Sequence, residues 1–451
     1  YEYAMRIGLN KTTELSAVIK ELFGKSIDQK INGLTTDSRN LKTGDIYIAL
    51  EGEIHDGHDY LNQVDKLNAA AVLINNSKEV GELNAQKIIV QDTKVALGEI
   101  AKRWRKNFNI PIIAITGSNG KTSTKELLYH VLKDKYNVHS TSGNYNTSIG
   151  LPLTMLSLSK YHDISILEMG ANQLGDIGYL CSIANPTHGL ITNISSAHLE
   201  GFGDIENITK TKSALFKALE EGISFVNYAD YRLKKLKISS EKITYGLNET
   251  CDFPADLHHD KNGSIILTID SNEIRTNSKN LSFAKNIIAV ASIAITLGID
   301  WKYFQDKILT FVPPKGRCKV LKYGSITVID DTYNSNLESC SAAIDYLNAF
   351  SGKGRNIAVL GDMLELGDAS EDQHRKLGDK CSSSKLDAVF TMGVETVYAH
   401  DSIENIKVKY HFEEHKDLIK TLKGHLNKND KVLFKGSRGM EMERVIAGVF
   451  E

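Results

Sequence analysis

The sequence predicts an α/β protein of three domains. Its 451 residues exceed what one hydrophobic core usually organises. Short β-branched segments alternate with helical patterns through the middle and last thirds, which favours parallel sheets. A Pro-Pro pair at 313–314 interrupts this alternation as a rigid hinge would. We therefore expect a small N-terminal α/β domain over residues 1–107, a central doubly wound sheet of the P-loop type over 108–312, and a C-terminal Rossmann-like α/β domain over 313–451.

Composition excludes several classes of partner. The hydrophobic share of 41% and charged share of 24% are ordinary for globular proteins. A formal net charge of −2 gives no electrostatic basis for binding nucleic acid or an anionic membrane. The longest apolar run, 287–299, spans about 13 residues, which is too short to cross a bilayer. We expect no nucleic-acid partner and no membrane insertion.

The cysteines indicate a reducing compartment. They are odd in number, widely spaced and without a C-x-x-C pair, which favours reduced thiols over disulfides or a zinc site. No export signal is visible at the start of the chain. We therefore expect a cytoplasmic protein. The five positions are Cys181, Cys251, Cys318, Cys340 and Cys381.

The first domain opens with a helical pattern over residues 15–22, and a strand is expected over 46–50. Between them lies Asp37-Ser38-Arg39, which has two interpretations. It is either a turn with a surface arginine or a site where the guanidinium grips a diphosphate. Spacing alone favours the turn.

The central domain opens with a candidate phosphate loop. The strand 112–115 leads into a glycine-rich turn, and a helix is expected over 125–132. Glycines let backbone N–H groups converge, and the helix N-terminus favours an anion. Lys121 would meet the phosphates and the Thr122 hydroxyl would ligate Mg²⁺. Ile115 stands where the full Walker pattern has its first glycine, so a plain turn with a capping threonine is the alternative. The predicted phosphate-binding residues are Gly117, Ser118, Asn119, Gly120, Lys121, Thr122 and Ser123.

Polar residues follow two further strands of this domain. Glu168 follows the strand 164–167, and His198 follows the strand 189–194. Ligands sit at the carboxyl ends of strands in doubly wound sheets, so both side chains are candidates for the nucleotide's metal. Alone, each is more often a surface residue or a cap.

Two other segments of the central domain are distinctive. Residues 243–276 alternate in polarity and carry an Asn-Gly turn at 262–263, which predicts an antiparallel appendage. Lys210 and Lys212 lie in a helical pattern, and by spacing alone both would be solvated.

The last domain repeats the strand–helix alternation, with strands expected over 326–330, 356–360, 388–392 and 432–434. Three of these strands end in polar or glycine-rich turns. The turns are 330–334, 361–363 and 435–439, and the last is a candidate loop for an anion such as a carboxylate.

These motifs together resemble the ATP-dependent Mur amide ligases over nearly the whole chain. The matching segments are Asp37–Arg39, Gly44–Asp45, Gly52–His58, the loop 116–122, Gly143–Thr147, Gly150–Pro152, Glu168–Gly170 and Asn193–His198. Val359–Gly367, with His374 downstream, is similar to the branch that adds D-alanyl-D-alanine to UDP-N-acetylmuramoyl-tripeptide. The D-N-P-R motif typical of the sister branch that adds the third amino acid does not occur in the sequence.

The resemblance implies the catalytic set. Lys121 would contact phosphates, Thr122 and Glu168 would hold a first Mg²⁺, and His198 a second. Lys212 falls where the family has a lysine carbamylated by CO₂, a modification that turns a cation into a carboxylate-like metal ligand.

The resemblance also implies the substrate contacts. The nucleotide would be held by Asn286, Arg317, Asp331, Tyr333 and Asn334. The UDP-substrate would face Ser38, Arg39, Asn144 and Asn146. The incoming dipeptide would meet Lys435 and Arg438.

Two positions depart from the family pattern. Asn286 is kept, but the glycine and histidine that usually precede it are not, and Leu337 replaces a usual proline. The implied reaction uses ATP and Mg²⁺ to join the dipeptide to the UDP-tripeptide through an acyl phosphate, in a protein expected to be monomeric. A sister ligase with another amine substrate, or a protein that binds ATP without turnover, are the alternatives.

Overall fold

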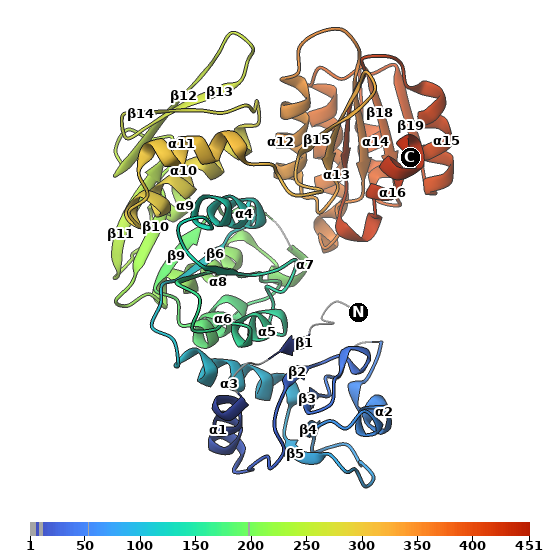
Figure 1. Ribbon diagram of the computed structural model, residues 1–451. Helices are drawn as coiled ribbons and strands as arrows, with labels where there is room; N and C mark the ends of the chain where they lie inside the picture. The colour runs from blue at the N-terminus through green and yellow to red at the C-terminus, as the bar shows by residue number, and fades with distance from the viewer. Residues whose placement is uncertain (1–5, 9–11, 53, 197–198) are drawn as a thin grey trace.

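The computed structural model describes residues 6–8, 12–52, 54–196 and 199–451. These residues form three α/β domains, each built on its own sheet, which confirms the predicted fold class (Figure 1). The central domain contacts both of the others. No helix in the described part of the chain is both long and apolar enough to cross a membrane.

The first sheet has the order β1-β2-β3-β4-β5, with β1 antiparallel and the rest parallel. Its strands are β1 (Arg6–Gly8), β2 (Gly33–Thr35), β3 (Asp45–Ile48), β4 (Ala71–Asn75) and β5 (Gln86–Val90). Its helices are α1 (Thr12–Phe23), η1 (Ser38–Asn40), η2 (Gly57–Tyr60), α2 (Leu61–Lys66) and α3 (Thr93–Arg105).

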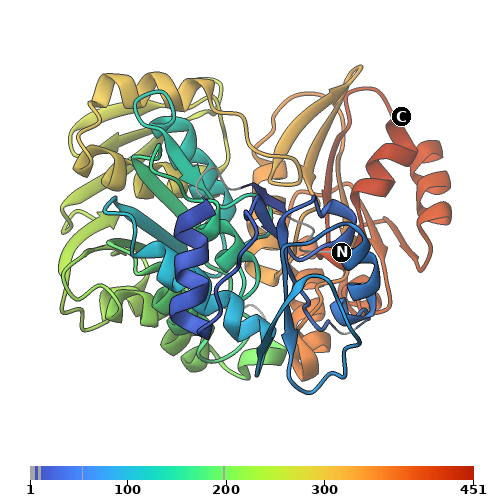
Figure 2. The ribbon, with the colours of Figure 1, turned by 60° about the horizontal axis from the view of Figure 1, so that its bottom comes forward.

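Helix α3 joins the first domain to the second. Its apolar residues, among them Leu97, Ile100 and Trp104, belong to a core that continues into the central domain. The buried Arg105 donates from Nε to the Ala184 carbonyl at 2.8 Å. The first and central domains are therefore held together by a shared core. Figure 2 shows the molecule from this end.

The central sheet has the order β14-β13-β12-β11-β10-β9-β6-β8-β7. Its strands are β6 (Ile112–Thr116), β7 (Val138–Ser140), β8 (Ile164–Glu168), β9 (His188–Ile191), β10 (Ile223–Asn227), β11 (Glu241–Gly246), β12 (Phe253–His259), β13 (Ile265–Ile269) and β14 (Asn272–Arg275). Its helices are α4 (Lys121–Leu132), α5 (Gly150–Leu156), α6 (Asp176–Ala184), α7 (Leu199–Phe202), α8 (Ile205–Lys217), α9 (Tyr231–Lys234), α10 (Leu281–Thr296) and α11 (Trp301–Thr310).

Strand β6 shows why this sheet needs helices on both faces. Ile112 and Ala114 belong to one core, and Ile113 and Ile115 to another, as a period of two requires. The predicted antiparallel appendage is present over β12–β14, but it continues the main sheet, since β12 pairs in parallel with β11.

The C-terminal sheet has the order β15-β16-β20-β17-β18-β19, and only β15 is antiparallel among the pairs described. Its strands are β15 (Lys319–Tyr323), β16 (Ile326–Asp331), β17 (Asn356–Gly361), β18 (Ala388–Met392), β19 (Val408–Phe412) and β20 (Lys431–Lys435). Its helices are α12 (Leu337–Asn348), η3 (Gly367–Ala369), α13 (Ser370–Ser382), α14 (Thr396–Ser402), α15 (His415–His425), η4 (Arg438–Met440) and α16 (Glu443–Phe450). The turn before β15 and the segment after β16 approach the loop between β6 and α4 and the start of α4.

Candidate functional site

The loop between β6 and α4 carries the glycines of the predicted phosphate loop, and Lys121 follows them. Gly117 has φ 144° and Gly120 has φ 83°, values that favour glycine. A Cβ at Gly117 would lie 1.9 Å from Thr192 Oγ1, so no larger residue fits. Lys121 opens α4, and its Nζ donates to the Gly117 carbonyl at 2.8 Å. Burial lowers the pKa of Lys121, which Glu168 opposes.

Glu168 is a buried carboxylate that is only half satisfied. It ends β8 and is 3% exposed. Its Oε1 accepts from Thr122 Oγ1 at 3.2 Å and from Asn146 Nδ2 at 2.8 Å. Its Oε2 has no hydrogen-bond partner among the described residues. A buried oxygen without a donor is costly, and a hydroxyl beside a carboxylate is a donor set that suits Mg²⁺.

The structure describes only part of the predicted metal site. Within the described ranges no three His, Cys, Asp or Glu side chains cluster around one point. His198, predicted to hold a second metal, lies outside the described residues. Glu168 and Thr122 fit the predicted first metal, and Asn146, predicted to face the UDP-substrate, contacts Glu168 directly.

Lys212 is buried, which corrects the expectation from spacing that it is solvated. Helix α8 places Lys212 on its inner face at 2% exposure, whereas Lys210 is exposed. Its Nζ lies 5.9 Å from the Phe202 ring centroid, and no hydrogen bond to Nζ is found within the described part of the chain. Burial lowers the pKa of Lys212 well below its ordinary value; Lys121 lowers it further and Asp176 opposes this.

The C-terminal domain reaches the loop at three points. Arg317 donates from Nη2 to Thr122 Oγ1 at 3.0 Å, and its guanidinium lies 3.9 Å from the Tyr333 ring centroid. Asn119 donates to Glu338 at 2.8 Å and accepts from Asn336 Nδ2 at 2.8 Å. The sequence reasoning missed Asn336 and Glu338, although both lie within four positions after the predicted Asn334.

A cavity of about 260 Å³ lies beside the loop. The predicted Asn286 lies in its wall, and its Oδ1 would be 2.9 Å from a Cβ at Gly120. The wall combines apolar and polar side chains, as pockets for small ligands usually do. Other lining residues include Asn193, Asn227, Leu247, Ile288 and Glu338.

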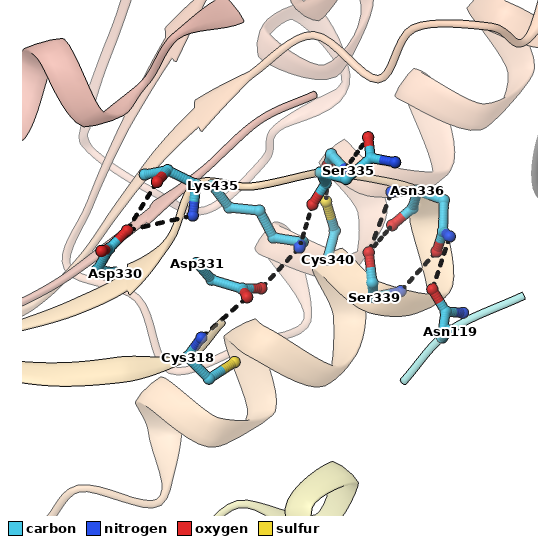
Figure 3. A network of polar contacts seen from close by, with 11 residues as sticks. Asn119, Cys318, Asp330, Asp331, Ser335, Asn336, Ser339, Cys340 and Lys435 are labelled. Carbon is cyan, nitrogen blue, oxygen red and sulfur yellow. Dashed lines mark hydrogen bonds and ion pairs between the residues drawn. The ribbon is translucent and has the colours of Figure 1, made fainter. Parts of the chain in front are cut away.

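Asp331 ends β16 and Lys435 ends β20, and their side chains point toward each other (Figure 3). Lys435 Nζ donates to Asp331 Oδ2 at 2.6 Å and to the Asn334 carbonyl at 2.9 Å. Asp331 Oδ1 accepts from the Cys318 backbone N–H at 3.0 Å. The predicted nucleotide ligand Asp331 and the predicted dipeptide ligand Lys435 thus bind each other.

The remaining motifs form ordered turns. Asp37 caps η1 and binds the Arg39 guanidinium at 2.6 Å, so the turn interpretation of this segment describes its local structure. In the C-terminal domain, Asp362 accepts from the Thr396 N–H at 2.7 Å, and buried His374 binds the Met363 N–H at 3.1 Å. These bonds fix the turn after β17.

Comparisons with known proteins agree over nearly the whole chain. The family description "Mur ligase middle domain" matches residues 115–294, "Mur ligase, glutamate ligase domain" matches 316–438, and "Mur ligase family, catalytic domain" matches 30–105. A Synechocystis protein named UDP-N-acetylmuramoyl-tripeptide–D-alanyl-D-alanine ligase is 36% identical, covering 96% of this chain and 95% of that protein. The Escherichia coli protein of that name is 30% identical over 94% and 95%.

Solved structures give the same result. A crystal structure of MurF from Acinetobacter baumannii has a TM-score of 0.87 at 26% identity, covering 99% of both chains. MurF from Thermotoga maritima in complex with ADP has a TM-score of 0.83 at 30% identity, covering 92% of this chain and 96% of that one.

Proposed function

The chain belongs to the Mur ligase family, and we propose that it joins D-alanyl-D-alanine to UDP-N-acetylmuramoyl-tripeptide with conversion of ATP to ADP and phosphate. It is an ATP-dependent ligase of peptidoglycan precursor synthesis. The observation that carries this assignment is the phosphate loop beside a half-satisfied buried carboxylate, with Arg317 of the C-terminal domain on the loop's own Thr122.

The chemistry begins with a poor electrophile. Attack on a carboxylate adds charge to an anion, whereas an acyl phosphate carries a good leaving group. Lys121 would hold the transferred phosphoryl group, and Arg317 would add a second cation from the other domain. The amine of the dipeptide then attacks the acyl carbon and phosphate leaves. Contact between the domains would exclude water from the acyl phosphate.

Mg²⁺ fits the oxygens of Thr122 and Glu168, where it would neutralise charge on the transferred phosphoryl group. His198 stays a predicted ligand of a second ion. Lys212 is suited to carbamylation, because the neutral amine is the form that reacts with CO₂ and burial favours that form. The product would be an anionic oxygen ligand in place of a buried amine.

The substrate contacts remain proposals as well. Asn286, Tyr333 and Asn334 would surround the adenosine beside the cavity, with Asp331 behind them. Ser38, Arg39 and Asn144 would face the UDP-substrate. We assign UDP-substrate binding to residues 1–107, ATP to 108–312 and the dipeptide to 313–451. One chain carries all of these groups, so we propose a monomer. We also propose that it works in the cytoplasm, where ATP is available.

The decisive experiment measures phosphate release with ATP, Mg²⁺ and UDP-N-acetylmuramoyl-tripeptide, with D-alanyl-D-alanine added or omitted, and determines the product mass. We expect release that needs the dipeptide and a product heavier by one dipeptide minus water. Lys121→Ala should lose at least about 100-fold in kcat, and exposed Lys133→Ala, just after the same helix, should not. Turnover with a single amino acid instead would identify a sister ligase, and ATP binding without turnover would contradict ligase activity.

A further inference from the structure

Lys435 is a buried cation that the proposed chemistry does not use. It ends β20 at 2% exposure, and its Nζ binds Asp331 and the Asn334 carbonyl. To bind a substrate carboxylate, its ammonium would have to leave a buried ion pair, which is strongly unfavourable. We call Lys435, Asp331, Asn334 and Cys318 the Lys435 cluster. Figure 3 labels Lys435, Asp331 and Cys318.

The first arm of the cluster leads to Arg317. Asp331 accepts from the Cys318 N–H at 3.0 Å, and neighbouring Asp330 accepts from the Gly316 N–H at 3.0 Å. The residues on both sides of Arg317 are thus fixed by carboxylates. Cys318 has φ 53°, a conformation that non-glycine residues rarely adopt without such support. This turn aims Arg317 at Thr122.

The second arm leads to Asn336. Lys435 holds the Asn334 carbonyl, and two residues later Asn336 caps α12 by accepting from the Ser339 N–H at 2.9 Å. The Asn336 amide nitrogen then donates to Asn119 Oδ1 in the phosphate loop at 2.8 Å. Both arms therefore start at one ammonium group and end on the same loop.

We propose that Lys435 is a positioning residue of the nucleotide site, which holds Arg317 and Asn336 against the phosphate loop without touching a substrate. Only the kinetic test of this inference rests on the proposed function. The binding tests use β,γ-imido-ATP with Mg²⁺ and need no ligation.

The first test measures the affinity for β,γ-imido-ATP by calorimetry in Lys435→Met. We expect the Kd to rise about tenfold, the scale of one lost charge-assisted contact. Lys431→Met is the matched control: Lys431 is a buried lysine at the other end of β20, whose Nζ binds the carbonyls of Gly352, Lys353 and Gly354. The Kd of Lys431→Met for β,γ-imido-ATP should stay within about twofold of the wild-type value. If Lys435→Met does not fold, Lys435→Met/Asp331→Asn removes the pair without leaving a lone charge and is measured instead.

The second test asks whether Lys435 acts through Arg317. Lys435→Met added to Arg317→Lys should raise the Kd by less than about threefold beyond Arg317→Lys alone, because residues that act as a unit are not additive. Full additivity would contradict this path.

The kinetic test separates positioning from direct binding. In Lys435→Met we expect a raised KM for ATP and a KM for D-alanyl-D-alanine within about threefold of the wild type. A tenfold rise in the dipeptide KM with unchanged nucleotide affinity would make Lys435 a dipeptide contact. Lower stability with both constants unchanged would make it merely structural. Wild-type protein that binds β,γ-imido-ATP but joins no dipeptide would refute the proposed function and leave the binding tests valid.

Discussion

Helix α8 around Lys212 and the end of β20 around Lys435 each bury a lysine to 2% exposure, but in opposite surroundings. Burial lowers the pKa of Lys212 well below its ordinary value, and the largest charge effect on it is a further lowering by the cation of Lys121. Burial is the largest single influence on Lys435 and opposes its charged form, but the raising effects, led by Asp331, together outweigh it and the pKa is raised. Burial disfavours the charged form of both lysines, and a nearby carboxylate determines whether the side chain stays protonated.

This difference in charge state suits the two side chains to different roles. A neutral amine is a nucleophile and can be carbamylated, so Lys212 suits chemistry. A paired ammonium has no free lone pair and is rigidly held, so Lys435 suits positioning. Exchanging or removing each lysine tests this contrast.

The largest expected effect is on the stability of the C-terminal domain. Lys435→Met leaves Asp331 buried without its cation, and we expect the free energy of opening to fall by about 3–5 kcal/mol. Hydrogen exchange of the β20 amides measures it locally, which is useful because both tryptophans, Trp104 and Trp301, lie outside this domain. Adding Asp331→Asn should recover most of the loss. Unchanged protection in Lys435→Met would mean that the ion pair contributes nothing.

The next effect is on catalysis. Lys212→Met removes the amine but keeps a side chain of similar length, and we expect kcat/KM to fall about 100-fold, or roughly 2.7 kcal/mol. Lys210→Met, on the exposed face of the same helix, should keep wild-type activity. Equal activity in both variants would remove Lys212 from the catalytic set.

A smaller effect of opposite sign is expected on stability. At pH 7 in buffer freed of CO₂, folding holds Lys212 in surroundings that disfavour its charge, so Lys212→Met should stabilise α8 by about 1–2 kcal/mol. The exchange rates of α8 amides give the value. A loss of protection would show that Lys212 has a stabilising partner.

The sequence predicts one side of the site much better than the other. Residues 117–122 are consecutive, so their glycines, lysine and threonine define a local geometry that the structure reproduces. The departure at Ile115 is explained, because this residue lies inside β6 at 0% exposure and not in the loop. By contrast, Lys435 and Asp331 are 104 positions apart, and only the parallel pairing of β16 with β20 brings them together.

The burial of Lys212 also depends on tertiary packing that residue spacing does not reveal. Spacing did not separate it from Lys210, since which face of α8 is buried depends on packing against β9 and α6. The resemblance to a family predicts its role, and this role stays a prediction. The structure shows a buried amine whose pKa is lowered.

The smallest effect is the pH dependence of stability, which should differ in sign between the two lysines. Lys435 has a raised pKa when folded, so its contribution is complete below the unfolded value near 10.5 and is lost as pH rises through the folded pKa. Lys212 has a depressed pKa, so between its folded pKa and 10.5 the unfolded chain binds more protons and stability rises with pH.

Urea unfolding followed by circular dichroism at pH 7, 9 and 11 tests this for wild type, Lys212→Met and Lys435→Met. From pH 7 to 9 the free energy of unfolding of the wild type should rise relative to that of Lys212→Met. From pH 9 to 11 it should fall by roughly 1 kcal/mol relative to that of Lys435→Met. Differences of the same sign in both comparisons would mean that the two lysines are in equivalent electrostatic surroundings, and the division between a reactive and a positioning lysine would fail.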